Sequence, residues 1–211
     1  TIRDHDPVFR GPEGDGDEGA VAVDRDLPGG QVGAAEDEAA LAERAPVARD
    51  DERVFALTAA MPDGTGLDLF GERFPNRTFD VGIAEQNLID FSAGLALEGL
   101  RPFAVGLAAM VPMRPAEQMR AAVGYMRANV TVIGIEAGVR FGPLGNTHYA
   151  MDDIAVVRAI PNFTVIAPSD PLSTHKALYA CMEHEGPVYM RLTGGPGYPL
   201  LYPEDFDFQI G

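Results

Sequence analysis

Glu85 is the first residue whose type and position suggest chemistry, because it lies where a predicted helix follows a predicted strand. The strand covers residues 79–83 and is short and largely apolar. The helix covers residues 84–98, since its apolar residues Leu88, Phe91, Leu95 and Ala96 recur at the three- and four-residue spacing of one helix face. The helix dipole favours a carboxylate in the first turn. From spacing alone, Glu85 is therefore an ordinary first-turn acid.

The sequence around Glu85, RTFDVGIAEQNLIDFSAGLALEGLRPFAV, resembles the pyrimidine-binding domain of the transketolase family. That family includes deoxyxylulose-phosphate synthase and, more distantly, the beta subunits of 2-oxoacid dehydrogenase E1. A second segment, GPLGNTH at 142–148 followed by MDDIAVVRAIPNFTVIAPSD, is similar to the family's G-x-D-G-P-T-H loop and the elements after it. Two motifs in family order are far more specific than either alone. The resemblance covers roughly residues 50–195.

The resemblance implies thiamine diphosphate as the cofactor, with Glu85 as its activating acid. In the family, a glutamate hydrogen-bonds N1′ of the aminopyrimidine and so helps to remove the C2 proton of the thiazolium, whose carbon then attacks a ketone. Glu85 matches that glutamate in the sequence GIAEQN. A buried carboxyl suits the sharing of a proton near neutral pH. This match outweighs the reading of Glu85 as an ordinary first-turn acid.

Three further residues match positions that bind substrate or cofactor in the family. His148 corresponds to the histidine that faces the reacting carbonyl or hydroxyl groups of the substrate. Arg191, in PVYMRL, matches an arginine that holds substrate phosphate, and a surface cation after a strand is an equally good interpretation. Arg114, in MRPAEQ, is expected beside the cofactor, where it either binds substrate or only braces the start of a helix.

Three positions depart from the family pattern. Val111 stands where the family has an aromatic side chain that stacks on the pyrimidine, and it is expected to cover that ring without stacking. Leu144 replaces the aspartate of the G-x-D-G loop, and Glu136 lies where transketolases place a basic contact to phosphate. Together, Leu144 and Glu136 suggest either a substrate unlike an ordinary sugar phosphate or a site that has lost some activity.

The order of elements predicts an α/β fold with a doubly wound, mainly parallel sheet and helices on both faces, as the resemblance also implies. Strands alternate with helices, and near-continuous apolar strands such as 130–135 are typical of parallel sheets buried on both faces. The expected strands are 54–59, 79–83, 102–107, 130–135, 163–167 and 187–191, and the expected helices are 84–98, 115–128, 151–158 and 171–183. Ligands of such folds bind at the carboxyl ends of the strands.

Composition predicts an acidic, Gly- and Pro-rich flexible arm at 1–48, and the resemblance implies a pyrimidine-binding domain at 49–195 followed by a tail at 196–211. The first 50 residues hold 13 acids against 5 arginines, which is half of the formal net charge of −16. This charge argues against nucleic acid or an anionic membrane as a partner. The lone Cys181, together with the lack of a signal-peptide pattern or an apolar run of transmembrane length, is typical of a cytoplasmic protein.

A thiamine diphosphate site also needs a half that binds Mg²⁺ and the diphosphate. The family motif for that half is Gly-Asp-Gly followed by a distant Asn, and the only resemblance to it, residues 14–16, follows no apolar strand. No metal ligands are therefore expected in this chain. We expect a separate diphosphate-binding subunit to supply Mg²⁺ and the other wall of the site, in an α2β2-type complex such as a split transketolase.

Three functions remain open from the sequence. The first is transfer of a two-carbon ketol unit between a ketose or 2-oxo donor and an acceptor, with Glu85 activating the cofactor. The second is an E1-beta-like or synthase-type subunit that passes an acyl unit to a carrier or an aldehyde. The third is a non-catalytic subunit retained for assembly, which Val111 and Leu144 favour and which Glu85 and His148 oppose.

Overall fold

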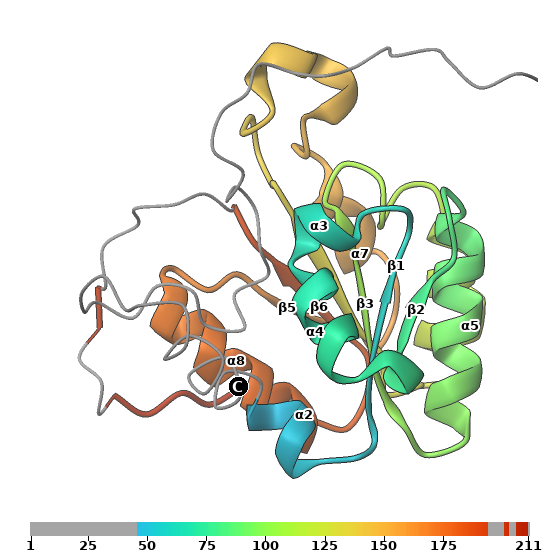
Figure 1. The fold of residues 1–211 in the computed structure, drawn as a ribbon. Coiled ribbons are helices and arrows are strands. Elements are labelled where there is room, and N and C mark those ends of the chain that lie inside the picture. The colour runs from blue at the N-terminus through green and yellow to red at the C-terminus, as the bar shows by residue number, and fades with distance from the viewer. Residues whose placement is uncertain (1–45, 194–200, 203–205, 211) are drawn as a thin grey trace, which may run out of the picture.

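The computed structural model describes residues 46–193, 201–202 and 206–210 (Figure 1). Almost all of the expected acidic arm, and part of the expected C-terminal tail, therefore lie outside the described residues. In the described part, one parallel sheet of six strands runs in the order β2-β1-β3-β4-β6-β5. The strands are β1 (Val54–Thr58), β2 (Thr78–Asp80), β3 (Arg101–Leu107), β4 (Thr131–Ile135), β5 (Thr164–Ile166) and β6 (Val188–Arg191). The predicted doubly wound α/β fold is confirmed.

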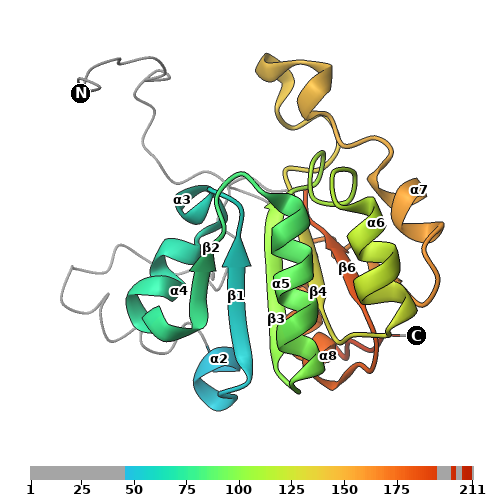
Figure 2. The same ribbon diagram turned by 90° about the vertical axis from the view of Figure 1, so that its right-hand side faces the viewer.

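Helices cover both faces of this sheet (Figures 1 and 2). One face carries α5 (Glu85–Leu97), α6 (Ala116–Gln118) with the π-helical stretch η2 (Met119–Tyr125), and α7 (Asp153–Arg158). The other face carries α2 (Pro46–Asp50), α4 (Leu67–Arg73) and α8 (Pro171–Glu183). Short connections contain α3 (Pro62–Thr65) and the 3-10 turns η1 (Pro75–Arg77), η3 (Gly142–Leu144) and η4 (Asn146–His148).

The strands build two cores because their side chains alternate between the faces and are apolar on both. In β3, Phe103 and Val105 join the core under α4 and α8, whereas Ala104 joins the core under α5 and η2. In β6, Met190 and Tyr189 divide in the same way. This burial on both faces explains why β3 and β6 are largely apolar in the sequence.

The predicted helix over 115–128 is wrong in its detail, because only 116–118 are α-helical, 119–125 form a π-helix and 126–128 are not helical. The backbone nitrogen of Ala128 bonds the carbonyl of Val123, five residues earlier, at 3.0 Å. The carbonyl of Gly124 accepts a hydrogen bond from the side chain of Asn162 at 2.9 Å. A wide turn of this kind cannot be told from an α-helix by apolar periodicity, and π-helical turns are frequent at functional sites.

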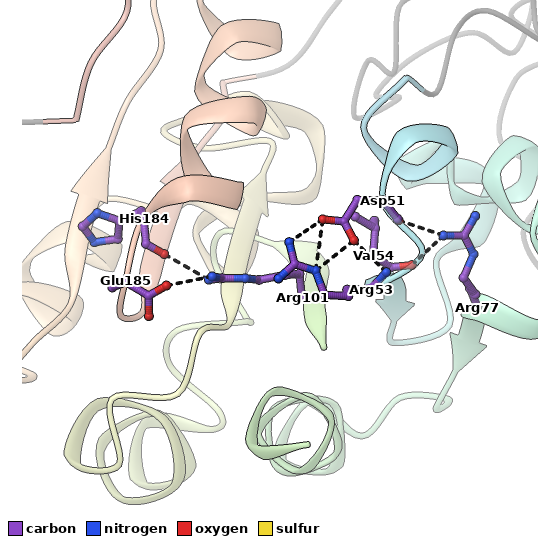
Figure 3. A network of polar contacts seen from close by, with 7 residues as sticks. All are labelled: Asp51, Arg53, Val54, Arg77, Arg101, His184 and Glu185. Atoms are coloured by element: carbon purple, nitrogen blue, oxygen red, sulfur yellow. Dashed lines mark hydrogen bonds and ion pairs between the residues drawn. The ribbon is translucent and has the colours of Figure 1, made fainter. Parts of the chain in front are cut away.

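The amino-terminal edge of the sheet is tied together by arginines (Figure 3). Arg53, just before β1, forms an ion pair of 2.6 Å with Asp51. Arg101, at the start of β3, pairs with Glu185 at 2.9 Å, and Arg77 donates to the backbone carbonyl of Asp51 at 3.1 Å. The contacts of Arg101 and Arg77 join segments that are distant in the sequence, and that of Arg53 is local, so these cations serve the structure.

At the opposite side of the sheet lie the carboxyl ends of the strands, which together we call the carboxyl edge. Here the chain reverses its direction of winding. From β1 the chain moves to β2 on one side and then crosses back through α5 to β3 on the other side. Ligands in open α/β sheets bind at such a switch point, beyond the carboxyl ends of the strands. The N-terminus of α5, with Glu85, lies at this edge, to which the arrow of β1 points in Figure 2.

Candidate functional site

The turn before Glu85 is fixed by a carboxylate at the end of β2. One oxygen of Asp80 accepts hydrogen bonds from the backbone nitrogens of Ala60 at 2.7 Å and Gly82 at 2.9 Å. Gly82 has a φ of 72°, a conformation that glycine adopts without strain. Asp80 therefore ties the ends of β1 and β2 together and sets where α5 begins, so that Glu85 starts the helix at the switch point.

Glu85 is a buried carboxylate with one cationic partner. It is 7% exposed, and its Oε1 accepts a hydrogen bond of 2.5 Å from Arg114. In the part of the chain that the structure describes, its Oε2 has no hydrogen-bond partner. Gln86, next along α5, donates to the backbone carbonyl of Arg114 at 3.2 Å, which holds the two segments together. Glu85 can thus offer its second oxygen to a ligand while the first stays anchored.

Val111 lies in the core. It has no exposed surface and packs among the side chains under α5 and η2. The backbone of Gly106 lies close to it, since a Cβ added at Gly106 would come 3.5 Å from the Cβ of Val111. In this chain by itself, Val111 packs beneath the segment that carries Arg114. An aminopyrimidine ring could contact Val111 only if that segment shifted.

A cluster of small side chains joins the two halves of this edge. Ala108 and Ala109, after β3, pack with Ala137 and Ala150, which flank the long loop after β4. Gly138 and Ala150 bond each other through both backbone groups, at 3.1 and 2.9 Å. The segment with Arg114 and the loop with His148 are therefore packed against each other through methyl groups.

His148 ends the second of two 3-10 turns in that loop, which stands above the carboxyl edge as the gold segment in Figures 1 and 2. The side chain is half-buried, with its ring edge-on to Phe141. The hydroxyl of Thr147 lies 3.0 Å from Nδ1. This contact leaves Nε2 as the ring nitrogen that can face a substrate.

Arg191 is held by a buried aspartate. Its Nε donates to Oδ2 of Asp153 at 2.8 Å, and its Nη2 donates to the backbone carbonyl of Ala150 at 3.1 Å. The hydroxyl of Tyr189 also donates to Oδ2 of Asp153, at 2.9 Å. Asp153 is 1% exposed, and its Oδ1 has no partner within the described residues. Arg191 thus ties the loop after β4 to the end of β6.

Glu136 and Arg140 form a second pair beside the first. Glu136 directly follows β4, is 5% exposed and lies 3.4 Å from Arg140. Its φ of 56° lies in the left-handed region, which is uncommon for a residue with a long side chain. The next backbone nitrogen, of Ala137, bonds the carbonyl of Leu192 at 2.9 Å and fixes this geometry against β6.

Of the predicted site residues, Glu85 and Arg114 are joined by a hydrogen bond. His148 lies in the loop after β4, and Arg191 at the end of β6 contacts that loop. Sequence reasoning missed Asp153, although an acid in the first turn of the helix after the His148 loop was a visible signal. It also missed Tyr189, which no motif marks. Within the described ranges, no group of three or more His, Cys, Asp or Glu side chains is arranged to hold a metal ion. Within the same ranges, no helix is both long and apolar enough to cross a membrane.

Comparison with known proteins defines the class. The transketolase pyrimidine-binding domain family matches residues 17–195, and the chain belongs to that family. Similar proteins include the 1-deoxy-D-xylulose-5-phosphate synthase of Heliobacterium modesticaldum, which is 42% identical over 159 residues, 75% of this chain and 24% of that protein. A second synthase, from Geobacter metallireducens, is 46% identical over 153 residues, 72% of this chain and 24% of that protein. The chain spans about a quarter of the length of these curated relatives.

Solved structures agree with this assignment. The structure described as a split-gene transketolase, an inactive beta4 tetramer, superposes with a TM-score of 0.68 at 33% identity, over 78% of this chain and 52% of that chain. The transketolase of Campylobacter jejuni superposes with a TM-score of 0.60, over 69% of this chain and 23% of that chain. At 20% identity, the second likeness shows the fold alone.

Proposed function

We propose that this chain is the pyrimidine-binding subunit of a thiamine diphosphate-dependent, transketolase-like enzyme that transfers a two-carbon ketol unit. The observation that carries the proposal is the Glu85 carboxylate, buried at the switch point with one oxygen anchored by Arg114 and the other unpartnered in the described chain. When bound, the cofactor supplies a carbon nucleophile and stabilises the resulting negative charge. Glu85 would hold the aminopyrimidine and share a proton with its N1′.

The burial of Glu85 fits this role physically. A carboxyl group removed from water interacts more strongly with a ligand nitrogen than one on the surface. The N-terminus of α5 favours its negative charge, and Arg114 fixes one oxygen. The remaining oxygen is therefore oriented before a ligand arrives. Val111 is not required to touch the ring for this contact to form.

His148 is proposed to act on the substrate. In the transfer from a ketose, the carbon–carbon bond beside the donor's carbonyl group breaks, and the rest of the donor leaves as an aldehyde after its hydroxyl group gives up a proton. A new carbon–carbon bond forms at the carbonyl carbon of the acceptor, whose oxygen takes up a proton. No oxidant or reductant is needed. With Nδ1 beside Thr147, Nε2 of His148 is the nitrogen that would hydrogen-bond or protonate that oxygen.

A partner subunit is proposed to supply Mg²⁺ and the contacts to the diphosphate. Two observations support this. The described residues form a single pyrimidine-binding domain, and the chain is 33% identical to a split-gene transketolase of which it covers about half. We propose an α2β2-type complex in which the carboxyl edge around Glu85 and His148 faces the partner.

The test is C2 deuterium exchange of thiamine diphosphate, measured by NMR in a complex of this chain with a diphosphate-binding subunit. Glu85→Gln keeps the shape of the side chain but cannot share a proton, so exchange and turnover should each fall by about two orders of magnitude or more. Cofactor affinity should change much less, because the lost interaction acts in the transition state. Glu98→Gln, an exposed change at the other end of α5, is the matched control. If the wild-type complex exchanges C2 no faster than free cofactor, the proposal fails.

The synthase relatives favour a second candidate function, transfer of an acyl unit from a 2-oxo acid to an aldehyde. They are 42% and 46% identical to this chain, against 33% for the split-gene transketolase. The donor distinguishes the two functions. Faster consumption of hydroxypyruvate than of pyruvate supports ketol transfer, and the reverse order supports the synthase-type reaction.

A further inference from the structure

We infer that the acceptor binding next to β4 and β6 carries no phosphate group, and that Glu136 is the residue that excludes a phosphorylated acceptor. The inference rests on the proposed function, whose acceptor must approach His148. It concerns the charge that this edge of the sheet presents to that acceptor.

Both arginines near the His148 loop are already neutralised by carboxylates. Arg191 pairs with Asp153 at 2.8 Å and also bonds the carbonyl of Ala150. Arg140 pairs with Glu136 at 3.4 Å. A phosphate dianion is normally bound by arginines that present uncompensated charge in a fork geometry. Among the described residues, the two cations and the two carboxylates of these pairs cancel, so the pairs present no net positive charge to a phosphate.

The two carboxylates are also the more deeply buried members of their pairs. The side chains of Asp153 and Glu136 are 1% and 6% exposed, against 18% for Arg191 and 37% for Arg140. A carboxylate in so dry a setting is weakly screened, and placing a second anion beside it is costly. An anion could therefore be accepted only after the existing pairs were disrupted.

The backbone at Glu136 holds this side chain in an uncommon conformation at the end of β4. Its φ of 56° is a conformation that costs free energy for a long side chain. The backbone contact between Ala137 and Leu192 maintains the strained position directly after β4. Such outliers concentrate at functional sites. The buried acid is thus fixed at the end of the strand that meets β6 and Arg191, where Gly134 pairs with Arg191.

Three large apolar side chains of the same segment face solvent, beside exposed polar residues such as Asn146 and Asp152. Val139, Leu144 and Met151 are 61%, 54% and 71% exposed. No charge on these side chains could compensate a phosphate, whereas an uncharged aldehyde with hydroxyl groups needs only hydrogen-bond partners such as His148. Together with the balanced arginine pairs, this surface favours an uncharged acceptor.

The test measures kcat/KM of the complex for glyceraldehyde and for glyceraldehyde 3-phosphate with one donor. The wild type should prefer glyceraldehyde by at least about ten-fold, the scale of one like-charge contact. Glu136→Gln, and Glu136→Asn as a second variant whose side chain tolerates positive φ, should each narrow that preference by about ten-fold or more. Glu183→Gln, an exposed change at the end of α8, should leave the preference unchanged.

Preference for the phosphorylated acceptor in the wild type, or an unchanged preference in both Glu136 variants, overturns the inference. If the inference is overturned but the complex still exchanges C2 at the normal rate, the proposed function is not affected. If the complex has no exchange activity, the proposed function fails and phosphate binding to the full chain decides the inference. The probe is an NMR titration with inorganic phosphate. Saturable shifts of the Gly138 and Ala150 amide signals that occur in a Glu136 variant but not in the wild type support the inference. Shifts in the wild type, or in none of the proteins, overturn it.

Discussion

Arg114 and Glu85 are joined by a 2.5 Å hydrogen bond in which the carboxylate is buried and the cation is not. The side chain of Glu85 is 9% exposed, whereas that of Arg114 is 43% exposed. The two residues are 29 positions apart, and each follows a different strand. The partly exposed arginine is therefore the partner that can move when a ligand binds, while the glutamate remains fixed at the start of α5.

The first prediction is that Arg114→Met destabilises the chain by about 1 kcal/mol, because it leaves a buried carboxylate without its cation. The value lies at the low end of the range for such losses, since solvent screens the exposed part of Arg114. Combining Arg114→Met with Glu85→Gln should recover most of the loss. Urea unfolding of the single and double variants measures the coupling, with the exposed Arg120→Met as the control. A coupling near zero would show that the pair contributes nothing to stability.

The fold was predictable from the sequence because the central strands β1, β3, β4 and β6 are largely apolar and buried, and each strand is followed by a helix or turn. The positions of β1, β3, β4 and β6 agree with expectation to within one residue at each end. The shorter β2 could not be predicted, because Val81 continues the apolar run but bonds only the carbonyl of Thr58 before the chain turns at Gly82. Where a strand ends depends on such neighbours, which its own sequence does not specify.

Site residues could be predicted only where they belong to a sequence motif. Glu85 and His148 lie at the expected edge because strand ends gather there in any parallel sheet. The partner of Arg191 was not predictable, because Asp153 is 38 residues away and their contact depends on how the His148 loop folds back. The burial of Val111 could likewise not be predicted from the sequence, since a valine that follows a strand can line an open site or lie in the core.

The second prediction concerns the support beneath Arg191. Tyr189→Phe removes a hydrogen bond to Asp153, whose other oxygen already lacks a partner in the described residues. We expect a loss of about 1–3 kcal/mol in the free energy of unfolding, because a buried carboxylate is left less satisfied. Burial raises the pKa of Tyr189, and the neighbouring Asp153 raises it further, so the hydroxyl remains a donor at all working pH values.

The matched control is Tyr179→Phe, which removes a hydroxyl from the exposed side of α8. Changes at such surface positions are usually within about 0.5 kcal/mol. Chemical denaturation of both variants compares the two hydroxyls directly. Equal effects of the two substitutions would mean that the hydrogen bond to Asp153 does not stabilise the fold.

The third prediction contrasts two glycines. A Cβ added at Gly134 in β4 would overlap the hydroxyl of Tyr189 and come 3.0 Å from the Cα of Ala108. Gly134→Ala should therefore destabilise the chain by about 1–3 kcal/mol, the usual cost of overpacking. A Cβ at Gly94 in α5 meets no heavy atom within 4 Å, so Gly94→Ala should stabilise the chain by about 0.5–1 kcal/mol. Thermal unfolding gives both signs, and a stabilising Gly134→Ala would contradict the packing described at this edge.

The fourth prediction concerns acid stability through Asp170, the N-cap of α8. Its carboxylate accepts hydrogen bonds from the backbone nitrogens of Ser173 at 2.7 Å, Leu201 at 2.7 Å and Tyr202 at 3.2 Å. Burial acts to raise the pKa of Asp170, but the hydrogen bonds from these three residues outweigh it and the pKa lies below its ordinary value. The charged form is therefore the one that stabilises the fold.

Because the pKa of Asp170 is lower in the folded than in the unfolded chain, its stabilisation is present above the unfolded value of about 4 and is lost as the pH falls through the folded value. Asp170→Asn can still cap the helix but cannot carry the charge. It should cost about 1–2 kcal/mol at neutral pH, the scale of charge-assisted hydrogen bonds, and the gap to wild type should close in strong acid. Denaturant unfolding from pH 7 down to about 2.5 follows the gap through the window set by these pKa values. Asp63→Asn, an exposed change in the first turn of α3, should show only a small gap at any pH. A gap for Asp170→Asn that stays constant over the whole range would mean that the charge on Asp170 contributes nothing, and that the cap acts through shape alone.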